Sequence, residues 1–166
     1  RIAHSHATEE NRVMGKVKKT VSDIYRAVMR VVIKKYATDI VGCSEKAGEY
    51  MCGKRLFRER GTVLPNYVNT DEYSFNAERR LQKRKELGIT NELLVGHAGS
   101  IYWIKNQTFL VSLLARLLEL RPDARLMLVG EENDGGETRA LAEKLNVADK
   151  VMFTGSRDDI PELLCA

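Results

Sequence analysis

Apolar residues recur every three or four positions in the first part of the chain, from about residue 9 to residue 36. This pattern predicts one long amphipathic helix. We expect its apolar stripe to be buried: Met14, Val17, Val21, Ile24, Val28 and Val31. Basic residues recur at similar spacings on a different face: Arg12, Lys16, Lys19, Arg26, Arg30 and Lys34. A short apolar segment at 39–43 predicts a strand, and Ser44 is placed to cap a helix that runs to about Cys52.

The second half of the chain alternates short apolar runs with helical patterns. The apolar runs predict strands at 93–98, 126–129 and 151–153. The helical patterns lie at 77–87, 106–120 and 137–145, and a further helix begins after Asp158. Strands this apolar have no face suited to water, so they predict a parallel sheet that is covered on both sides. The fold class is therefore α/β.

The boundary between two domains is predicted in an irregular stretch. A short extended piece at 62–64 runs into proline, asparagine and aspartate, which favour a connection over a helix or strand. We therefore divide the chain into a domain at 1–64, a linker at 65–76 and a domain at 77–166. The sequence begins at Arg1 and stops within the second turn of the last expected helix, so we expect a fragment with both domains incomplete. Such a fragment should expose apolar surface and form dimers or dissolve poorly.

Composition narrows the class of protein without identifying a ligand. The 166 residues are 43% hydrophobic and 30% charged, which is typical of a globular protein, and no apolar run is long enough to span a membrane. A net charge of +4 suits a partner that carries phosphate, whether nucleotide, nucleic acid or anionic lipid. The three cysteines have no metal-like spacing with the three histidines, so we expect reduced, buried thiols in a cytoplasmic protein and no zinc site.

Each of the three strands predicted in the second half ends at a glycine: Gly99, Gly130 and Gly155. Ligands of open parallel sheets bind outside the carboxyl ends of the strands, where glycine lets a phosphate approach the backbone. Backbone geometry alone explains most single glycines in such turns, but three in succession favour a ligand. Lys105, between Gly99 and the next helix, is a compact cation suited to phosphate. The alternative is that Lys105 is a solvated surface lysine without a role in binding.

Six segments in the same order resemble one known family. They lie at 2–6, 37–45, 63–66, 95–110, 126–130 and 151–164, and include Ile2-Ala3-His4-Ser5-His6, Val95-Gly96-His97-Ala98-Gly99 with Lys105-Asn106, and Val151-Met152-Phe153-Thr154-Gly155. Together they resemble the retaining glycosyltransferases of family 4 that build bacterial capsule and exopolysaccharide. The resemblance spans essentially the whole chain. It implies a GT-B fold, with two Rossmann-like domains and the nucleotide-sugar donor held mainly by the second.

The resemblance also implies roles for particular residues. Residues 1–64 would belong to the acceptor-side domain, and 77–166 to the nucleotide-sugar-binding domain. Members use no metal or other cofactor, because the nucleotide sugar is the substrate and the protein supplies the positive charge for its leaving diphosphate. Lys105 would grip that diphosphate, together with Gly99 and the residue at position 100. We assign nucleotide binding to Gly130, Gly155 and Arg157, and catalysis to His6, which would lie near the sugar and phosphate.

Two departures from the family leave a second interpretation open. Ser100 stands where the family usually has an arginine, and the family's paired glutamates would lie beyond Ala166. The first hypothesis is a fragment, inactive alone, of an enzyme that transfers a hexosyl group to a polysaccharide or lipid-linked acceptor. The alternative is a non-catalytic nucleotide-binding or assembly relative. A nucleic-acid-binding protein is disfavoured, because the aromatic residues do not interleave with the basic ones.

The remaining candidates have mostly structural explanations. The basic face at 12–34 would rest on the anionic inner leaflet of the membrane, giving peripheral contact, or would simply be solvated. His4 and His6 share one strand face, but a polar strand end is favoured over a metal pair. We expect His97 to be a hydrogen-bonded core histidine, and the acidic run at 131–136 to be a solvated loop.

Overall fold

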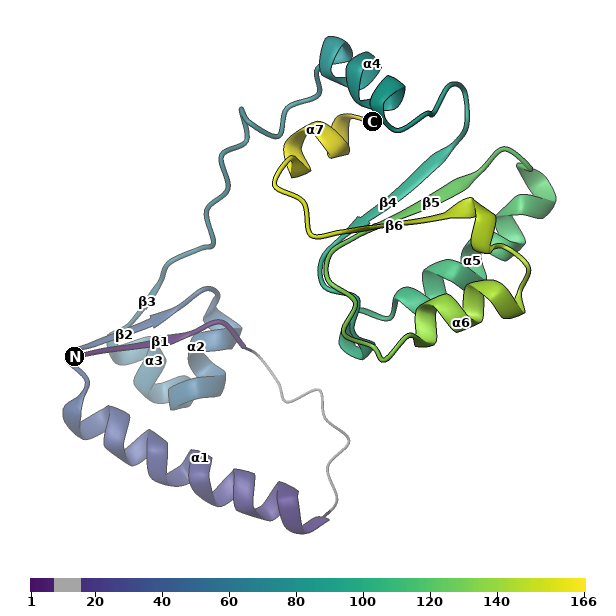
Figure 1. Ribbon diagram of the computed structural model, residues 1–166. Coiled ribbons are helices and arrows are strands. Elements are labelled where there is room, and N and C mark those ends of the chain that lie inside the picture. The colour runs from purple at the N-terminus through teal and green to yellow at the C-terminus, as the bar shows by residue number, and fades with distance from the viewer. Residues whose placement is uncertain (8–15) are drawn as a thin grey trace. The chain divides into compact units, whose positions relative to one another are not determined.

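The computed structural model describes residues 1–7 and 16–166, which form two units, Arg1–Val68 and Asn69–Ala166. The division between them falls within the stretch 65–76. The first unit contains a parallel sheet in the order β1 (Ile2–Ser5), β2 (Asp39–Gly42) and β3 (Gly61–Val63) (Figure 1). Its helices are α1 (Lys16–Tyr36), α2 (Glu45–Cys52) and α3 (Lys54–Arg60). Ser44 caps α2 as predicted, because its hydroxyl accepts a hydrogen bond of 3.2 Å from the Ala47 amide.

The core of the first unit forms around the ring of Phe57. Phe57 packs with Ile40 and Cys52, and all three are buried. A methyl group added at Gly48 or Gly61 would lie only 2.0 or 2.2 Å from the Phe57 ring. These two glycines therefore provide the space that the ring fills, and a larger residue at either position would displace it.

The predicted burial of the apolar stripe on the first helix is wrong for this chain. The side chains of Val17, Val21, Ile24, Val28 and Val31 are between 55% and 78% exposed. Among the residues of α1 whose burial the structure describes, the half-buried ones are Ser22, Arg26, Met29, Arg30 and Ile33, so the face that includes two predicted basic positions packs inward. Tyr50 of α2 explains this, since Arg26 lies over its ring at 4.8 Å and Arg30 donates to its carbonyl oxygen at 3.0 Å. Arg12 and Met14 lie outside the described residues.

The second unit is a parallel sheet covered on both faces, as the sequence predicted. Its strands are β4 (Leu94–Ala98), β5 (Arg125–Val129) and β6 (Val151–Gly155), in that order. Leu126 and Leu128 of β5 pack into one core with α5 (Gln107–Leu120) and α6 (Glu137–Lys144). Met127 and Val129 face the other way and join the core that includes Leu163 of α7 (Ile160–Cys165). Figure 1 shows α5 and α6 on one side of the sheet and α7 on the other.

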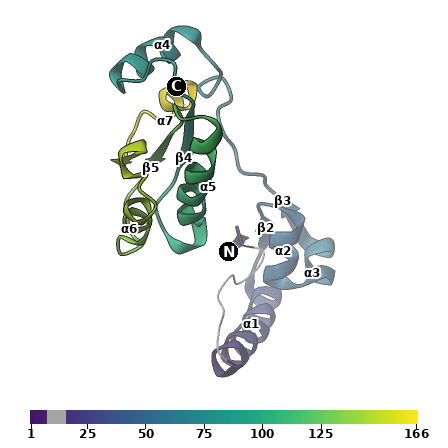
Figure 2. The same cartoon turned by 90° about the vertical axis from the view of Figure 1, so that its right-hand side faces the viewer.

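An ion-pair network holds α4 (Ala77–Glu86) against the start of α7, and both views show these helices together (Figure 2). The Lys83 ammonium lies 2.6 Å from a carboxylate oxygen of Asp159 and 2.6 Å from one of Glu86. Arg157 completes the network by donating to both carboxylates. Hydrogen bonds from Arg157 and then from Lys83 hold the pKa of the Asp159 carboxyl far below its ordinary value.

Acid should therefore destabilise the second unit through this network. A carboxyl group with a lowered pKa in the folded state stabilises that state above its unfolded pKa of about 3.9, and this contribution disappears as pH falls. We expect Asp159→Asn to reduce the free energy of unfolding at pH 6, and the gap to the parent protein to narrow at pH 3. Urea denaturation at the two pH values measures this. An equal gap at both values would mean that the charge of Asp159 does not contribute.

Candidate functional site

The carboxyl edge of the second sheet brings the three predicted glycines side by side. Gly99 follows β4 and donates its amide hydrogen to the Val129 carbonyl oxygen at 2.7 Å. Gly130 follows β5 and donates to the carbonyl oxygen of Gly155, the last residue of β6, at 2.8 Å. The backbone of the three strand ends is therefore continuous at this edge, where ligands of parallel sheets bind.

The three glycines are required for different reasons. A Cβ at Gly130 would lie 2.4 Å from the Gly99 carbonyl oxygen, so the backbones of two strand ends approach too closely for a side chain. Gly155 has open space around it but a φ of +67°, which disfavours residues that carry a Cβ. Around Gly99, which has a φ of +144°, the nearest atom to such a Cβ is 3.5 Å away. Packing therefore explains Gly130, whereas Gly99 and Gly155 leave room for a ligand.

Lys105 lies in the connection that leaves the carboxyl end of β4. It ends a short 3-10 helix, η1 (Trp103–Lys105), and its amide hydrogen bonds the Tyr102 carbonyl oxygen at 2.8 Å. Asn106 then adopts a left-handed φ of 54°, and α5 begins at Gln107. The Lys105 side chain is exposed, and its ammonium group makes no hydrogen bond or ion pair with any other described residue. Its charge is therefore available to an anion at this edge.

Gln107 fixes the loop that carries Lys105, a role that no sequence pattern indicated. Its side chain is 2% exposed. The amide nitrogen donates to the Ser100 carbonyl oxygen at 2.9 Å, and the amide oxygen accepts from the Tyr102 amide at 3.2 Å. The neighbouring Ile101 is buried and its main chain bonds Glu131 and Asn133. A glutamine in the first turn of a helix is usually solvated, so only the fold reveals this function.

The two other candidate residues at this edge do not add free positive charge to it. Ser100, at the position where the resembling family carries arginine, is exposed and supplies no charge. Arg157 already donates hydrogen bonds to Asp159 and Glu86, and these bonds, the one to Asp159 first, raise its pKa further. Its charge is therefore largely balanced within the protein, and a role in nucleotide binding stays a prediction that requires this pairing to open.

One ring nitrogen of His97 differs from the sequence prediction, whereas most residues of the acidic loop at 131–136 are exposed, as predicted. The Nδ1 atom of His97 is buried but has no hydrogen-bond partner among the described residues, so the expectation of a hydrogen-bonded core histidine is wrong for this atom.

Within the loop at 131–136, Asp134 is half-buried and accepts hydrogen bonds from the Gly136 amide and from the amide and hydroxyl of Thr138. Burial opposes ionisation of Asp134, but these bonds outweigh it and lower its pKa. Asp134 therefore caps the start of α6.

In the first unit, His6 follows the carboxyl end of β1 and is exposed. Its ring centroid lies 4.3 Å from that of His4. Within residues 1–7 and 16–166, no group of three or more histidine, cysteine, aspartate or glutamate side chains is placed to hold a metal ion. The catalytic role of His6 stays a prediction. In the same ranges, no helix is long and apolar enough to cross a membrane.

The three cysteines form no disulfide. Cys52 and Cys165 are buried and Cys43 is half-buried, as free thiols. Burial raises the pKa of the Cys52 thiol and outweighs the opposing effect of nearby Arg30. Cys52 therefore remains protonated and unreactive at neutral pH.

The chain has parallel α/β sheets, with a glycine-lined carboxyl edge and an adjoining lysine in the second unit. A family model matches the part of the chain that carries this edge. Residues 79–166 match the model described as "Glycosyl transferases group 1". The match covers more than half of the chain, and the chain belongs to this family.

Individual relatives agree with this assignment. The glycosyltransferase EpsF of Bacillus subtilis (strain 168) is 29% identical over 99% of this chain and 42% of its own length. N-acetyl-alpha-D-glucosaminyl L-malate synthase of Bacillus anthracis is 31% identical over 109 residues, which are 61% of this chain and 28% of that protein. The chain thus spans less than half the length of these relatives.

Solved structures confirm the fold. Anabaena Alr3699/HepE in complex with UDP and glucose matches with a TM-score of 0.77 and 22% identity, over 99% of this chain and 44% of that one. WaaG, a glycosyltransferase involved in lipopolysaccharide biosynthesis, matches with a TM-score of 0.66 and 24% identity, over 96% of this chain and 47% of that one. The α/β fold with Rossmann-like parallel sheets, predicted from the resemblance to GT-B glycosyltransferases, is confirmed by these matches.

Proposed function

We propose that the full-length protein is a nucleotide-sugar-dependent glycosyltransferase, and that this chain carries the part of its donor site that binds the diphosphate. The observation that carries this proposal is Lys105, whose unpaired ammonium group projects from an anchored loop at the glycine-lined edge of the sheet. Membership of the glycosyl transferase family supports it. A structural neighbour, Anabaena Alr3699/HepE, was solved in complex with UDP-glucose.

The proposed chemistry needs positive charge where the diphosphate leaves. Groups held in place before the reaction stabilise developing negative charge without further reorganisation. Lys105 supplies one such charge, and the amides near Gly99 and Gly155 supply dipoles. We assign the transfer of a hexosyl group, with retention of configuration and no metal, to a polysaccharide or lipid-linked acceptor. His6 is the proposed catalytic residue of the first unit.

A direct assay tests the proposed activity. Full-length protein is incubated with UDP-hexoses or GDP-hexoses and an undecaprenyl-phosphate-linked saccharide, and release of nucleoside diphosphate is followed. We expect acceptor-dependent release with at least one donor and no inhibition by EDTA. Saturable nucleotide binding without release for any donor would instead favour the non-catalytic relative.

One observation favours that second candidate. Arg157 is engaged by two carboxylates and Ser100 is uncharged, so Lys105 is the one candidate cation of the described edge that has no protein partner. A site with less positive charge binds a diphosphate but stabilises its departure less well. The comparison of binding with turnover separates the two functions.

The substitution Ser100→Arg should strengthen nucleotide binding. A guanidinium group at this exposed position can bind two phosphate oxygens together, which a serine hydroxyl cannot do. We expect a gain of about 1 kcal/mol, typical of one added hydrogen bond, measured by calorimetry of UDP binding to the full-length protein. Ser100→Gln, similar in reach but uncharged, is the control. Weaker binding by the arginine variant would show that position 100 serves packing or specificity.

Peripheral membrane contact through residues 12–34 also belongs to the proposal. The described part of this stretch combines an exposed apolar stripe on α1 with exposed Lys19 and Lys34. Apolar and basic side chains together favour an anionic lipid surface. We expect the full-length protein to sediment with phosphatidylglycerol vesicles and not with phosphatidylcholine vesicles; equal sedimentation with both would contradict an electrostatic contribution.

A further inference from the structure

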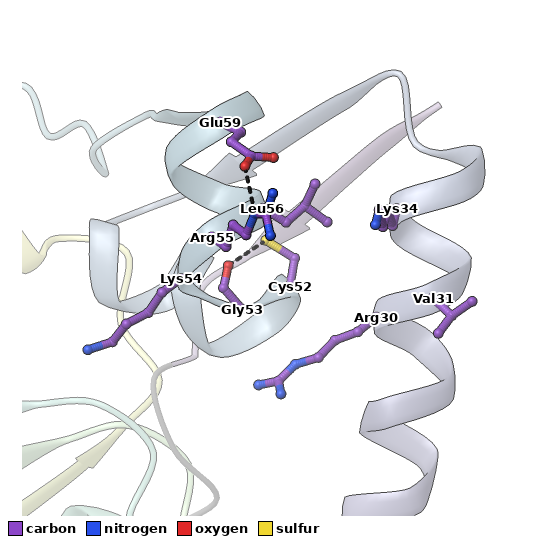
Figure 3. Close-up of a pocket in the computed structure, with 9 residues that line it drawn as sticks. All are labelled: Arg30, Val31, Lys34, Cys52, Gly53, Lys54, Arg55, Leu56 and Glu59. Atoms are coloured by element: carbon purple, nitrogen blue, oxygen red, sulfur yellow. Dashed lines mark hydrogen bonds and ion pairs between the residues drawn. The ribbon is translucent and has the colours of Figure 1, made fainter.

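A cavity of about 460 Å³ opens between the last turns of α1 and the junction of α2 with α3 (Figure 3). It is lined by Arg30, Val31, Lys34, Cys52, Gly53, Lys54, Arg55, Leu56 and Glu59. The end of α1 lies beside the amino end of β1, because the Thr38 amide donates to the Arg1 carbonyl oxygen at 2.9 Å. His6 follows the opposite, carboxyl end of that strand. The cavity is therefore separate from the residues assigned to glycosyl transfer.

Positive charge is in excess around this cavity. Four of its lining side chains are cationic, Arg30, Lys34, Lys54 and Arg55, and only Glu59 is acidic. Glu59 is already bound to Arg55, with 2.9 Å between its Oε1 and the Arg55 Nε. In the part of the chain that the structure describes, the ammonium groups of Lys34 and Lys54 have no hydrogen bond or ion pair. Like charges gathered in this way repel unless an anion lies among them.

Arg30 also carries an unsatisfied donor. Figure 3 shows its side chain extending from α1 toward the α2–α3 junction. One terminal nitrogen donates to the Tyr50 carbonyl oxygen at 3.0 Å, which ties α1 to the last turn of α2. The Nε atom is buried and has no partner among the described residues. An unpaired buried donor costs about 1–3 kcal/mol, so the structural contact with Tyr50 explains only part of the position of Arg30.

Cys52 does not supply the missing negative charge. Its Sγ lies 3.3 Å from the Gly48 carbonyl oxygen, to which the thiol donates. A group that donates in this way is protonated, and burial keeps it so at neutral pH. The charge in this cavity is therefore not balanced by the protein itself.

We propose that this cavity binds a phosphate group, carried either by a small soluble molecule or by a lipid headgroup. Phosphate has the charge and the several acceptor oxygens to bind the Arg30 guanidinium together with an unpaired lysine of this cavity. The volume is that of a ligand site rather than of a single ion, so the group that carries the phosphate also finds room. Val31 and Leu56 provide apolar surface beside it.

The test measures phosphate binding by the full-length protein. Glycerol 3-phosphate is titrated while ³¹P linewidth and thermal stability are followed, in the Lys105→Ala background so that the proposed donor site does not contribute. We expect saturable binding that Lys34→Glu and Lys54→Glu each weaken by at least tenfold. Lys46→Glu is the matched control, because Lys46 is exposed on α2 and does not line the cavity. It should change the affinity less than twofold.

The outcomes separate the two sources of phosphate and the competing explanations. Binding of phosphatidic acid vesicles but not of glycerol 3-phosphate, lost in the same two variants, identifies a lipid headgroup; saturable binding of glycerol 3-phosphate identifies a soluble ligand. An equal loss in Lys46→Glu would reduce the effect to overall charge and overturn the proposal. The absence of binding in both arms would do the same. Neither result depends on whether the protein transfers a sugar.

Discussion

Replacing Lys105 by alanine is expected to weaken binding of UDP to the full-length protein by at least tenfold. The ammonium group is unpaired among the described residues and lies on a loop held at the carboxyl edge of the sheet. A hydrogen bond to a charged group contributes about 1.5–3 kcal/mol, and each 1.4 kcal/mol corresponds to about a factor of ten in the dissociation constant. Isothermal titration calorimetry at constant ionic strength measures the change.

The control for this substitution is Lys144→Ala. Lys144 is also exposed, but it lies in the last turn of α6, a helix that leaves the carboxyl edge and runs toward the other edge of the sheet. The Lys144→Ala substitution removes the same charge from the same unit, so the affinity of this variant for UDP should stay within twofold of that of the parent protein. If Lys105→Ala bound UDP as well as Lys144→Ala does, the donor diphosphate would bind elsewhere.

The largest loss of stability is expected from Gly130→Ala. The added Cβ would lie 2.4 Å from the Gly99 carbonyl oxygen and 2.9 Å from the Ser100 amide nitrogen, and φ at this position is +140°. Both contacts are with backbone, which cannot move aside as a flexible side chain would. We expect the free energy of unfolding to fall by about 3 kcal/mol or more, as for other severe steric and backbone strain. Urea denaturation followed by circular dichroism measures this change.

Gly155→Ala is the matched comparison at the same edge. Nothing lies within 4 Å of a Cβ added there, so the cost should be limited to the left-handed φ of +67°, about 1–2 kcal/mol. The difference between the two variants isolates the close approach of the backbones at Gly130. Equal losses would show that the strand ends separate easily and that conformation alone selects glycine at both positions.

The parts of the fold that could be predicted are those determined by neighbouring residues in the sequence rather than by contacts between distant ones. Strands buried on both faces produce continuous apolar runs, and this is why β4, β5 and β6 were predicted close to their observed bounds. The inward face of α1 could not be predicted, because Tyr50 of another helix determines it through Arg26 and Arg30. An amphipathic pattern identifies a helix and its two faces, but not which one meets a partner within the same chain.

The candidate site likewise contains residues that the local sequence predicts and residues whose roles depend on distant contacts. The order of strand, glycine, lysine and helix places Lys105 without any knowledge of contacts. The pairing of Arg157 with Glu86 is different, because the two residues are 71 positions apart and meet only through the packing of α4 and α7. Gln107 is likewise informative only once its hydrogen bonds to both sides of the loop are seen.

The anchoring of the loop at 100–106 has an entropic consequence. Ile101 and Gln107 hold its main chain before any ligand is present, so a ligand would not have to order its backbone, which costs about 1–2 kcal/mol for each residue fixed. Only the side chain of Lys105 would lose rotational freedom, at a cost of about 2 kcal/mol. Association with the ligand would then not require the loop to fold first. Trp103 and Ile104 are exposed, so they could be substituted while Lys105 stayed in position.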